Sequence, residues 1–263
     1  MKTINYTEIK EISGKIYHVA HIEINRPKQL NALNANTIND LSNKLNEIQD
    51  NSNIRSVIIT AAGERAFVAG ADIKEFQNFN KKEALDLSME GKTQLFKKIK
   101  HFPKPVISGI QGFALGGGLE LALATHIRVA GPSAKLGLPE CSLGLIPGYS
   151  GTQELPRIIG VNRAMELILT AQPIQAEEAY RIGLVNQLTQ TDEAIFPECL
   201  KIAAKFNRSS PEALASAIKS INSCYLESGE TIESEEFSKL FETDNFKEGV
   251  LAFLEKRTPK FNK

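Results

Sequence analysis

The feature that most constrains the fold is the alternation of short apolar runs with segments of helical periodicity. Residues 16–24 and 57–60 are dense in apolar side chains. Between them, residues 36–50 place apolar side chains at spacings of three and four, which is typical of an amphipathic helix. Further apolar runs follow at 106–110 and 127–130. Because each crossover between strands has to cover a face of the sheet, this order predicts an α/β fold with parallel pairing.

The chain of 263 residues fits either one large domain or a domain with an appendage. The strand signals stop near residue 205. Ser210-Pro211-Glu212 then predicts a helix start, with a capping hydroxyl, a proline in the first turn and an acid facing the helix dipole. Apolar residues between 246 and 254 predict a last amphipathic helix. We therefore expect a core over 1–204 that holds the site, and a helical region over 205–263 that packs on its own core or on a neighbouring subunit.

Charge and cysteine content exclude several classes of partner. Lys plus Arg and Asp plus Glu both total 31, so no basic excess indicates a nucleic-acid partner or an anionic membrane surface. No signal-peptide core and no apolar run of about 18 residues is present, which predicts a soluble chain without a membrane partner. The three cysteines, Cys141, Cys199 and Cys224, lack CxxC spacing, which disfavours a disulfide framework or a zinc site. A cytoplasmic location is the simplest expectation.

The most informative segment runs from residue 111 to 120, where a strand gives way through three glycines to a helix. The first N–H groups of a helix lack intrahelical partners and carry partial positive charge, so this geometry forms an anion site. Glu120 follows Gly117 by three residues and so lies on the same helical face. A backbone donor at Gly117 and a carboxylate are therefore expected to face one point.

Two further segments supply matching groups. Glu140 stands in a segment rich in Pro and Gly, residues 138–153, which predicts a functional loop. Residues 67–74 repeat the pattern of the glycine segment, with an aromatic residue, small residues and then an acid that opens a helix. A second backbone donor at Ala71 would complete an oxyanion hole with two N–H groups.

This combination favours one kind of chemistry. A two-donor hole stabilises the enolate oxygen that forms when a thioester conjugated to a C=C bond is attacked at its β-carbon, and loss of one donor typically costs about 10²–10³ in rate. Two carboxylates held in a poorly solvated cleft cannot easily both be ionised, so the pKa of one rises towards the range useful for moving a proton of water. No metal is required.

Each feature alone has a plainer interpretation. A glycine triplet often serves close packing, Glu120 could simply face a helix dipole, and Glu140 could be a surface acid. Their combination favours a site. The fingerprint G-x-G-x-x-G is absent, and Gly118 stands where a P-loop needs Lys, which disfavours nicotinamide and ATP chemistry. Residues 148–152 approach a nucleophile elbow, but Thr152 replaces the final Gly and the stretch is predicted to be loop.

Several distinct motifs in this order resemble the crotonase (enoyl-CoA hydratase/isomerase) superfamily, and the likeness is closest to its short-chain enoyl-CoA hydratases. It covers nearly the whole chain. The resembling segments are residues 24–27 with 31–34, 66–74, 112–120, 138–153, 179–185 and 253–257. Ser150, Glu154 and Leu138 depart from the family pattern, which often has Gly, a basic residue and Gln respectively at these places, so they bear on substrate preference.

The resemblance implies residue roles. Ala71 and Gly117 would donate to the thioester oxygen, and Glu120 and Glu140 would bracket the catalytic water. Glu140 would be the main acid/base group, while Glu120 would hold and help deprotonate the water. The residues implied to bind the coenzyme A part are Ala69, Ala71, Asp72, Ile73, Lys74 and Gly117, with Phe253 and Lys256 reaching a neighbour's coenzyme A.

The resemblance also implies a crotonase-type spiral of β-β-α turns, followed by helices that build homotrimers or homohexamers. The implied reaction is reversible hydration of short trans-2-enoyl-CoA to 3-hydroxyacyl-CoA, with no cofactor because coenzyme A is part of the substrate. A double-bond isomerase and a non-catalytic acyl-CoA-binding protein stay as alternatives. The packing of a helix expected over residues 75–92 would set the acyl length.

Overall fold

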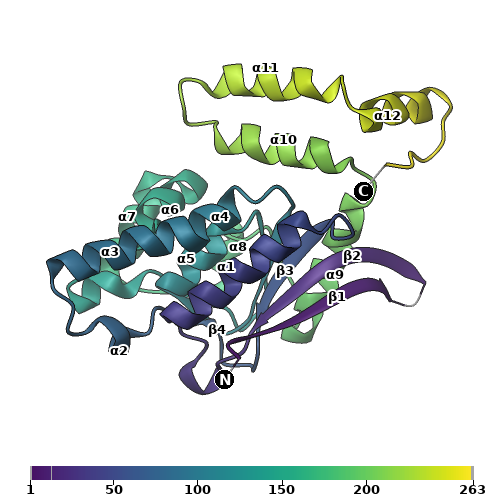
Figure 1. Ribbon diagram of the computed structural model, residues 1–263. Coiled ribbons are helices and arrows are strands. Elements are labelled where there is room, and N and C mark those ends of the chain that lie inside the picture. The colour runs from purple at the N-terminus through teal and green to yellow at the C-terminus, as the bar shows by residue number, and fades with distance from the viewer. Residues whose placement is uncertain (1, 13, 262–263) are drawn as a thin grey trace.

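The computed structural model describes residues 2–12 and 14–261, which form two sheets with their helices and an outer helical layer (Figure 1). In the larger sheet neighbouring strands are parallel, except for the antiparallel pair at its edge. Its strands in spatial order are β1 (Ile4–Ile12), β2 (Lys15–Ile24), β3 (Ser56–Ala61), β5 (Val106–Ile110), β7 (Ile127–Ala130) and β10 (Gln187–Leu188). The sequence patterns predicted four of these strands and missed the two edge strands: β1, whose residues are mostly exposed, and β10, which has only two residues.

The smaller sheet is parallel apart from its last pair. Its strands in spatial order are β4 (Ala66–Val68), β6 (Phe113–Leu115), β8 (Lys135–Gly137) and β9 (Ile174–Gln175). The pairs β3 and β4, β5 and β6, and β7 and β8 follow one another in the chain, and each pair gives one strand to each sheet before a helical segment. The expected spiral of β-β-α turns is confirmed.

The helices largely follow the predicted periodicity. They are α1 (Ala35–Asp50), α2 (Ile73–Phe76), α3 (Lys81–Gly91), the π-helical turn η2 (Lys92–Phe96), α4 (Lys97–Lys100), α5 (Gly117–Ala124), α6 (Gly151–Ile159), α7 (Val161–Thr170), α8 (Ala176–Arg181), α9 (Ile195–Phe206), α10 (Pro211–Asn222), α11 (Gly229–Leu240) and α12 (Asp244–Leu254). Three short 3₁₀ turns complete them: η1 (Pro27–Gln29), η3 (Pro139–Leu143) and η4 (Asp192–Ala194).

Two of the expected segments differ from the structure. The single helix expected over 75–92 is wrong, because Asn80 starts a new helix there: its side chain accepts hydrogen bonds from the amides of Lys82 and Glu83 in a capping box. The loop expected over 138–153 is also wrong in part, since residues 139–143 form η3 and α6 begins at Gly151.

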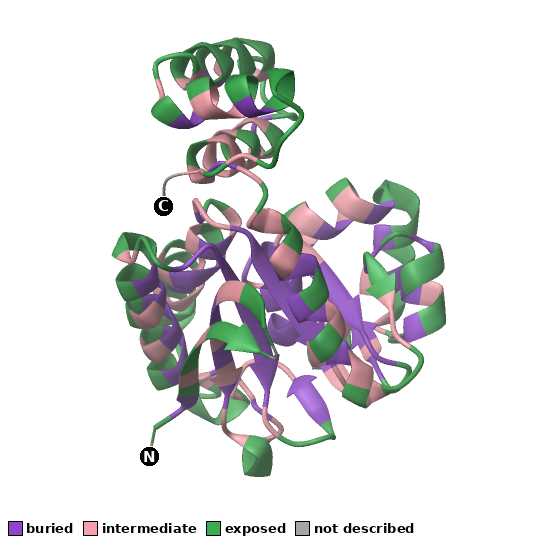
Figure 2. Ribbon diagram, turned by 90° about the vertical axis from the view of Figure 1, so that its right-hand side faces the viewer, coloured by how far each residue is buried: buried purple, intermediate pink, exposed green. Residues whose placement is uncertain are grey.

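The central strands β3 and β5 of the large sheet are buried on both faces, whereas the edge strand β1 is largely exposed (Figure 2). Alternate residues of β3 point in opposite directions: Val57 and Ile59 belong to the main core cluster, while Ile58 packs in a second cluster with Cys199 of α9. A strand that is buried on both faces has a continuous run of apolar residues in the sequence. Residues 57–60 form such a run.

Helices α10 to α12 form a layer that stands away from the body and is largely exposed (Figures 1 and 2). Arg55 donates to the carbonyl of Ser209 at its base, and Asn222 donates to the carbonyl of Lys100 at 2.6 Å. The predicted helix start is confirmed, since Ser210 caps α10. The predicted division at 204/205 falls within the last turn of α9 and stays a prediction. In the described part of the chain, no helix is long and apolar enough to cross a membrane.

The smaller sheet depends on one close approach of backbone to backbone. A Cβ placed on Gly118 would lie 2.0 Å from the carbonyl oxygen of Val68, so only glycine allows α5 to start against β4. Gly249 in α12 gives a contrast, because a Cβ there would come no closer than 3.4 Å to the ring of Phe261.

We expect Gly118→Ala to destabilise the protein by about 2 kcal/mol or more through overpacking. In the matched control Gly249→Ala, the added methyl group fits, and the helix should gain up to about 1 kcal/mol from lower backbone entropy in the unfolded chain. Urea denaturation of both variants at equal concentration would measure the difference. Equal stability of the two variants would contradict the close approach.

Candidate active site

The carboxyl ends of β4 and β6 lie side by side because these strands pair in parallel. The chain leaves β4 through residues 69–71, and it leaves β6 through Gly116 into α5. These two exits touch, since a Cβ placed on Gly117 would lie 3.4 Å from the amide nitrogen of Ala71. The structure therefore brings together the two residues predicted as backbone donors.

Both predicted amides are free to donate. The parallel bridge between Leu33 and Ala71 uses neighbouring amides: the N–H of Leu33 donates to the carbonyl of Gly70 at 2.8 Å, and that of Asp72 donates to Leu33 at 2.7 Å. Gly117 is the first residue of α5, where N–H groups have no intrahelical acceptor. Across residues 2–12 and 14–261, no acceptor in the chain takes the N–H of Ala71 or of Gly117. Both can therefore donate to one oxyanion.

Glu120 lies one turn into α5 with 3% of its surface exposed. Its Oε1 accepts hydrogen bonds from the amides of Tyr149 and Gly151, both at 2.7 Å, which leaves Oε2 for a ligand or water. Burial raises the pKa of Glu120 to about 7; the amide of Gly151 opposes this rise, nearby Glu140 adds to it, and the amide of Tyr149 opposes it. A carboxyl group in this range can exchange a proton near neutral pH.

Glu140 lies in the first turn of η3 and is half-buried. A Cβ placed on Gly116 would lie 2.7 Å from its Oε1, so the carboxylate rests against the backbone that leads to the donor of Gly117. Its Oε2 is buried and has no hydrogen-bond partner among the residues that the structure describes. Burial raises its pKa as well. Both acids therefore have raised pKa values, and burial rather than their mutual repulsion is the leading cause.

One cavity of about 440 Å³ is lined by both acids and both donors. Its wall also includes Ala69 and Ile73, two of the residues predicted to contact coenzyme A. The opposite side comes from α3, η2 and the loop before α6. Residues on this side include Leu87, Ser88, Lys92, Leu145, Tyr149 and Ser150.

Four of the predicted coenzyme A contacts do not line this cavity. Asp72 forms an ion pair with Arg26 at 3.1 Å, and Lys74 is exposed on α2. Phe253 and Lys256 belong to the outer helical layer, where the Phe253 side chain is 82% exposed. Their contacts with coenzyme A stay predictions.

Sequence reasoning missed the two amides that hold Glu120. The segment 148–151 was expected to be loop, whereas Gly151 begins α6 and Ser150 precedes it with a left-handed φ of 89°. The available signal for these amides was the small residues at the start of α6, since small residues at the start of α5 had indicated the donor at Gly117. Main-chain donors at Tyr149 and Gly151 carry no side-chain signature of their own.

Glu154, one of the departures from the family pattern, has a local explanation. Its carboxylate pairs with Lys100 at 2.7 Å and with Arg157 at 3.1 Å. This acid is therefore neutralised within the chain.

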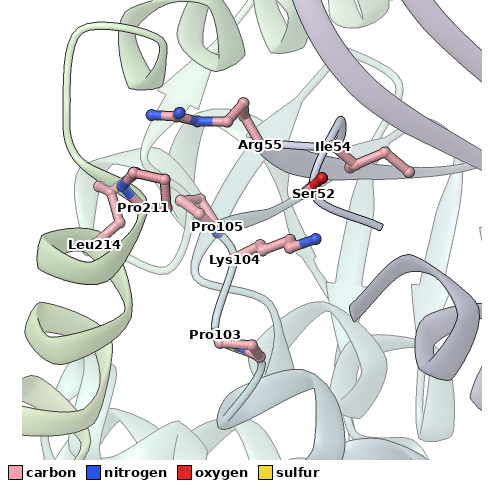
Figure 3. A pocket seen from close by; sticks show the side chains of 8 residues that line it. All are labelled: Ser52, Ile54, Arg55, Pro103, Lys104, Pro105, Pro211 and Leu214. Carbon is pink, nitrogen blue, oxygen red and sulfur yellow. The ribbon is translucent and has the colours of Figure 1, made fainter. Parts of the chain in front are cut away.

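A second cavity lies where α10 meets the body (Figure 3). At about 60 Å³ it is too small for a thioester of coenzyme A. Its two cations are used by main-chain carbonyls: Arg55 donates to Ser209, and Lys104 donates to Ile48 and Asn51 at 2.7 and 2.8 Å. Its lining residues are Ser52, Ile54, Arg55, Pro103, Lys104, Pro105, Pro211 and Leu214. This cavity belongs to the joint between body and outer layer.

Comparison with known proteins adds independent evidence. Residues 15–263 match the family described as enoyl-CoA hydratase/isomerase. A probable enoyl-CoA hydratase of Bacillus subtilis (strain 168) is 44% identical over 92% of this chain and 95% of its own. The short-chain-enoyl-CoA hydratase of Clostridium acetobutylicum is 42% identical over 95% of each chain.

A solved structure agrees in three dimensions. The crystal structure of enoyl-CoA hydratase from Bacillus anthracis superposes with a TM-score of 0.89 at 38% identity and covers 98% of both chains. The match therefore extends through the body and the outer helical layer. With a spiral of two sheets, and two amide donors and two acids in one cavity, the chain belongs to the enoyl-CoA hydratase/isomerase family.

Proposed function

We propose that the protein is a hydro-lyase that adds water across the double bond of a short trans-2-enoyl-CoA to give 3-hydroxyacyl-CoA, and that it also catalyses the reverse reaction. The observation that carries this proposal is the meeting of a buried carboxylate, a half-buried carboxylate and two unused amide donors in one cavity. Relatives named short-chain-enoyl-CoA hydratase and crotonyl-CoA hydratase, 42% and 41% identical, support the same substrate class.

The amides of Ala71 and Gly117 would hold the thioester oxygen. As water attacks the β-carbon, the electron pair of the C=C bond moves towards the carbonyl and negative charge develops on this oxygen. Two fixed N–H donors, one of them at a helix N-terminus, stabilise that charge without reorganisation. The charge is stabilised more in the transition state than in the ground state, so the donors accelerate the reaction.

The two acids would handle the water. Oε1 of Glu120 is held by Tyr149 and Gly151, so its Oε2 can accept a hydrogen bond from the water and orient it. Glu140, with an unpartnered Oε2, would activate the water and deliver a proton to the α-carbon. The hydroxyl group ends on the β-carbon and one proton on the α-carbon, so the reaction is balanced without a cofactor beyond the thioester itself.

A double-bond isomerase is the nearest rival. It needs one base to move a proton between two carbons, and Glu140 alone could do this. The burial of a second acid, Glu120, favours hydration. Conversion of a 3-enoyl-CoA to the 2-enoyl isomer without formation of the hydroxy product would favour the isomerase. Tight acyl-CoA binding without turnover of any enoyl thioester would instead indicate a binding protein.

The outer layer would build a homotrimer or a pair of trimers. Its apolar side chains Phe237, Phe241, Phe253 and Leu254 are at least half exposed in the single chain. A neighbour that covers them would bring Phe253 and Lys256 to a second active site, where they would contact coenzyme A beside Ala69, Asp72 and Lys74.

The expected cytoplasmic location stays a prediction.

We expect crotonyl-CoA to lose its conjugated ultraviolet absorbance rapidly in the presence of the wild-type protein. Glu140→Gln and Glu120→Gln should each lower kcat by at least about 10³-fold, because each removes a group that moves or holds the reacting proton. Both variants should still bind acyl-CoA, as isothermal titration would show. Near-normal turnover in either variant would contradict the mechanism with two acids.

Glu120→Gln should also be more stable than the wild type at high pH. The pKa of Glu120 in the folded protein, about 7, lies above its value of 4.5 in the unfolded chain, so the folded state binds the proton more tightly. The stability contributed by this carboxyl group is present below pH 4.5 and is lost as the pH rises to 7. Denaturation at pH 5, 7 and 8 would measure the gap between wild type and variant. A gap that does not grow with pH would contradict the raised pKa.

Light scattering should give three or six times the chain mass at assay concentration. Phe253→Ser should shift the protein towards smaller species, because burying an exposed aromatic side chain stabilises the assembly by about 2 kcal/mol. The matched control Lys247→Ser alters an exposed residue of α12 on a different side of the helix. A monomeric wild type would contradict the proposed assembly.

A further inference from the structure

The segment that holds Glu120 is itself held by α3 and the turn that follows it. The hydroxyl of Ser88 in α3 donates to the carbonyl of Gly148 at 2.7 Å. Gly148 directly precedes Tyr149, whose amide donates to Glu120. Helix α3 therefore holds the residue that directly precedes Tyr149, whose amide fixes the Glu120 carboxylate.

The ring of Tyr149 makes the larger contact. It is 7% exposed and stacks on Phe96 with ring centres 4.6 Å apart and planes 13° apart. It also lies directly against Gly91, where a Cβ would come within 2.5 Å of Cε1, 3.1 Å of Cδ1 and 3.3 Å of Cζ. The ring is therefore confined by Phe96 and by the bare backbone of Gly91.

The π-helical turn explains how both residues reach the ring. In a regular α-helix, residues five apart lie about 140° apart around the axis. Here the amide of Lys97 donates to the carbonyl of Lys92, five residues back, so the helix is locally wider. The extra residue in the turn brings Phe96 round towards the side of Gly91, and both then contact one aromatic ring.

We propose that Gly91 and the π-helical turn are positioning elements for Glu120, which act through the ring and main chain of Tyr149. This inference rests on the proposed catalytic role of Glu120. Gly91 touches neither acid, and its function is to leave the space that the Tyr149 ring occupies. The absence of a side chain at 91 thereby sets where the amides of Tyr149 and Gly151 point.

The expected effect of Gly91→Ala follows from this contact. The ring would have to withdraw by about 1 Å to reach the separation of about 3.5 Å at which carbon atoms attract. Because the ring is packed on Phe96, the main chain of Tyr149 would move with it. A misplacement of about 1 Å can lower a rate by about 10²-fold. We therefore expect kcat for crotonyl-CoA to fall about 10- to 100-fold while the KM changes little.

The pH profile separates positioning from a general loss of structure. The charged and titratable groups that act on Glu120 are Glu140, which raises its pKa, Lys92, which lowers it, and the Tyr149 phenol, whose own pKa burial raises to about 12. Gly91→Ala changes none of these groups and weakens the amide donors that lower the pKa of Glu120. The limb of the kcat/KM profile that reports Glu120 should therefore move to higher pH.

The experiment compares the wild type, Gly91→Ala, Tyr149→Ala, the double variant and the control Glu90→Ala, with crotonyl-CoA as substrate. Glu90 is the exposed neighbour of Gly91 in α3, and its replacement should leave turnover unchanged. If Gly91 acts through the ring, Gly91→Ala should have no further effect in the Tyr149→Ala background. Phe96→Leu removes the ring that stacks on Tyr149 without adding bulk at residue 91, and it should also lower kcat. This variant tests the proposal even if Gly91→Ala does not fold.

Three outcomes would overturn the proposal. One is a folded Gly91→Ala enzyme with kcat within about twofold of the wild type and an unshifted pH limb. Another is full additivity of the two substitutions, which would mean that Gly91 acts independently of Tyr149. The third is a wild-type rate in Phe96→Leu. Glu120→Gln, assayed alongside, separates failure of this inference from failure of the proposed role of Glu120. If Glu120→Gln is inactive while Gly91→Ala has normal activity, only the positioning role of Gly91 fails. If Glu120→Gln is active, the proposed role of Glu120 fails.

Discussion

The site depends on the contact between two stretches of backbone, residues 68–71 and 116–118. Their approach is possible because Gly118 has no side chain to strike the carbonyl oxygen of Val68, and because Gly116 adopts a φ of 52° beside the Glu140 carboxylate. Parallel pairing of β4 and β6 brings the ends of both strands to one edge of the sheet. The glycines then allow the two stretches of backbone to come into direct contact. Everything chemical follows from this contact: the two amides converge, Glu120 lies one helical turn further on, and Glu140 rests against the same backbone.

The electrostatic character of the site comes from burial moderated by main-chain donors. Desolvation disfavours the charged form of each acid, and it is the leading cause of the raised pKa of both Glu120 and Glu140. For Glu120 the amides of Gly151 and Tyr149 act in the opposite direction. The result is a pKa of about 7, which is set by burial and lowered again by two main-chain amides of the segment that leads into α6. Small movements of that segment therefore change proton affinity and geometry together.

The sequence predicted the parts of the molecule that follow a periodic or side-chain rule. Four strands of the large sheet, helix α1 and the Ser210 cap could be read from apolar spacing and capping chemistry, and Gly117 and Glu120 from the geometry of a helix start. What escaped prediction obeys no such rule. The amides of Tyr149 and Gly151 look like any other amides, and Gly91 in a helical pattern looks only like a weak helix former. The edge strand β1 has little buried surface to mark it, and the capping box at Asn80 divides what its flanking residues suggest is one helix. Contacts with a neighbouring subunit, such as those proposed for Phe253, could not be predicted from the periodicity of a single chain.

Ser150 shows that the loop holding Glu120 carries backbone strain. A residue with a side chain at a φ of 89° and ψ of 7° is less stable than glycine there, by about 1 kcal/mol or more. The strained residue stands between the two residues whose amides bind Oε1 of Glu120, and it lines the cavity. Glycine would relieve the strain but would also loosen the main chain at the point where two donors have to be held at fixed positions. Ser88, Gly91 and Phe96 contact the two residues that precede Ser150 in the same loop, Gly148 and Tyr149. Strain at Ser150 and tight packing at Tyr149 are thus two consequences of one requirement, a fixed pair of amides for a buried acid.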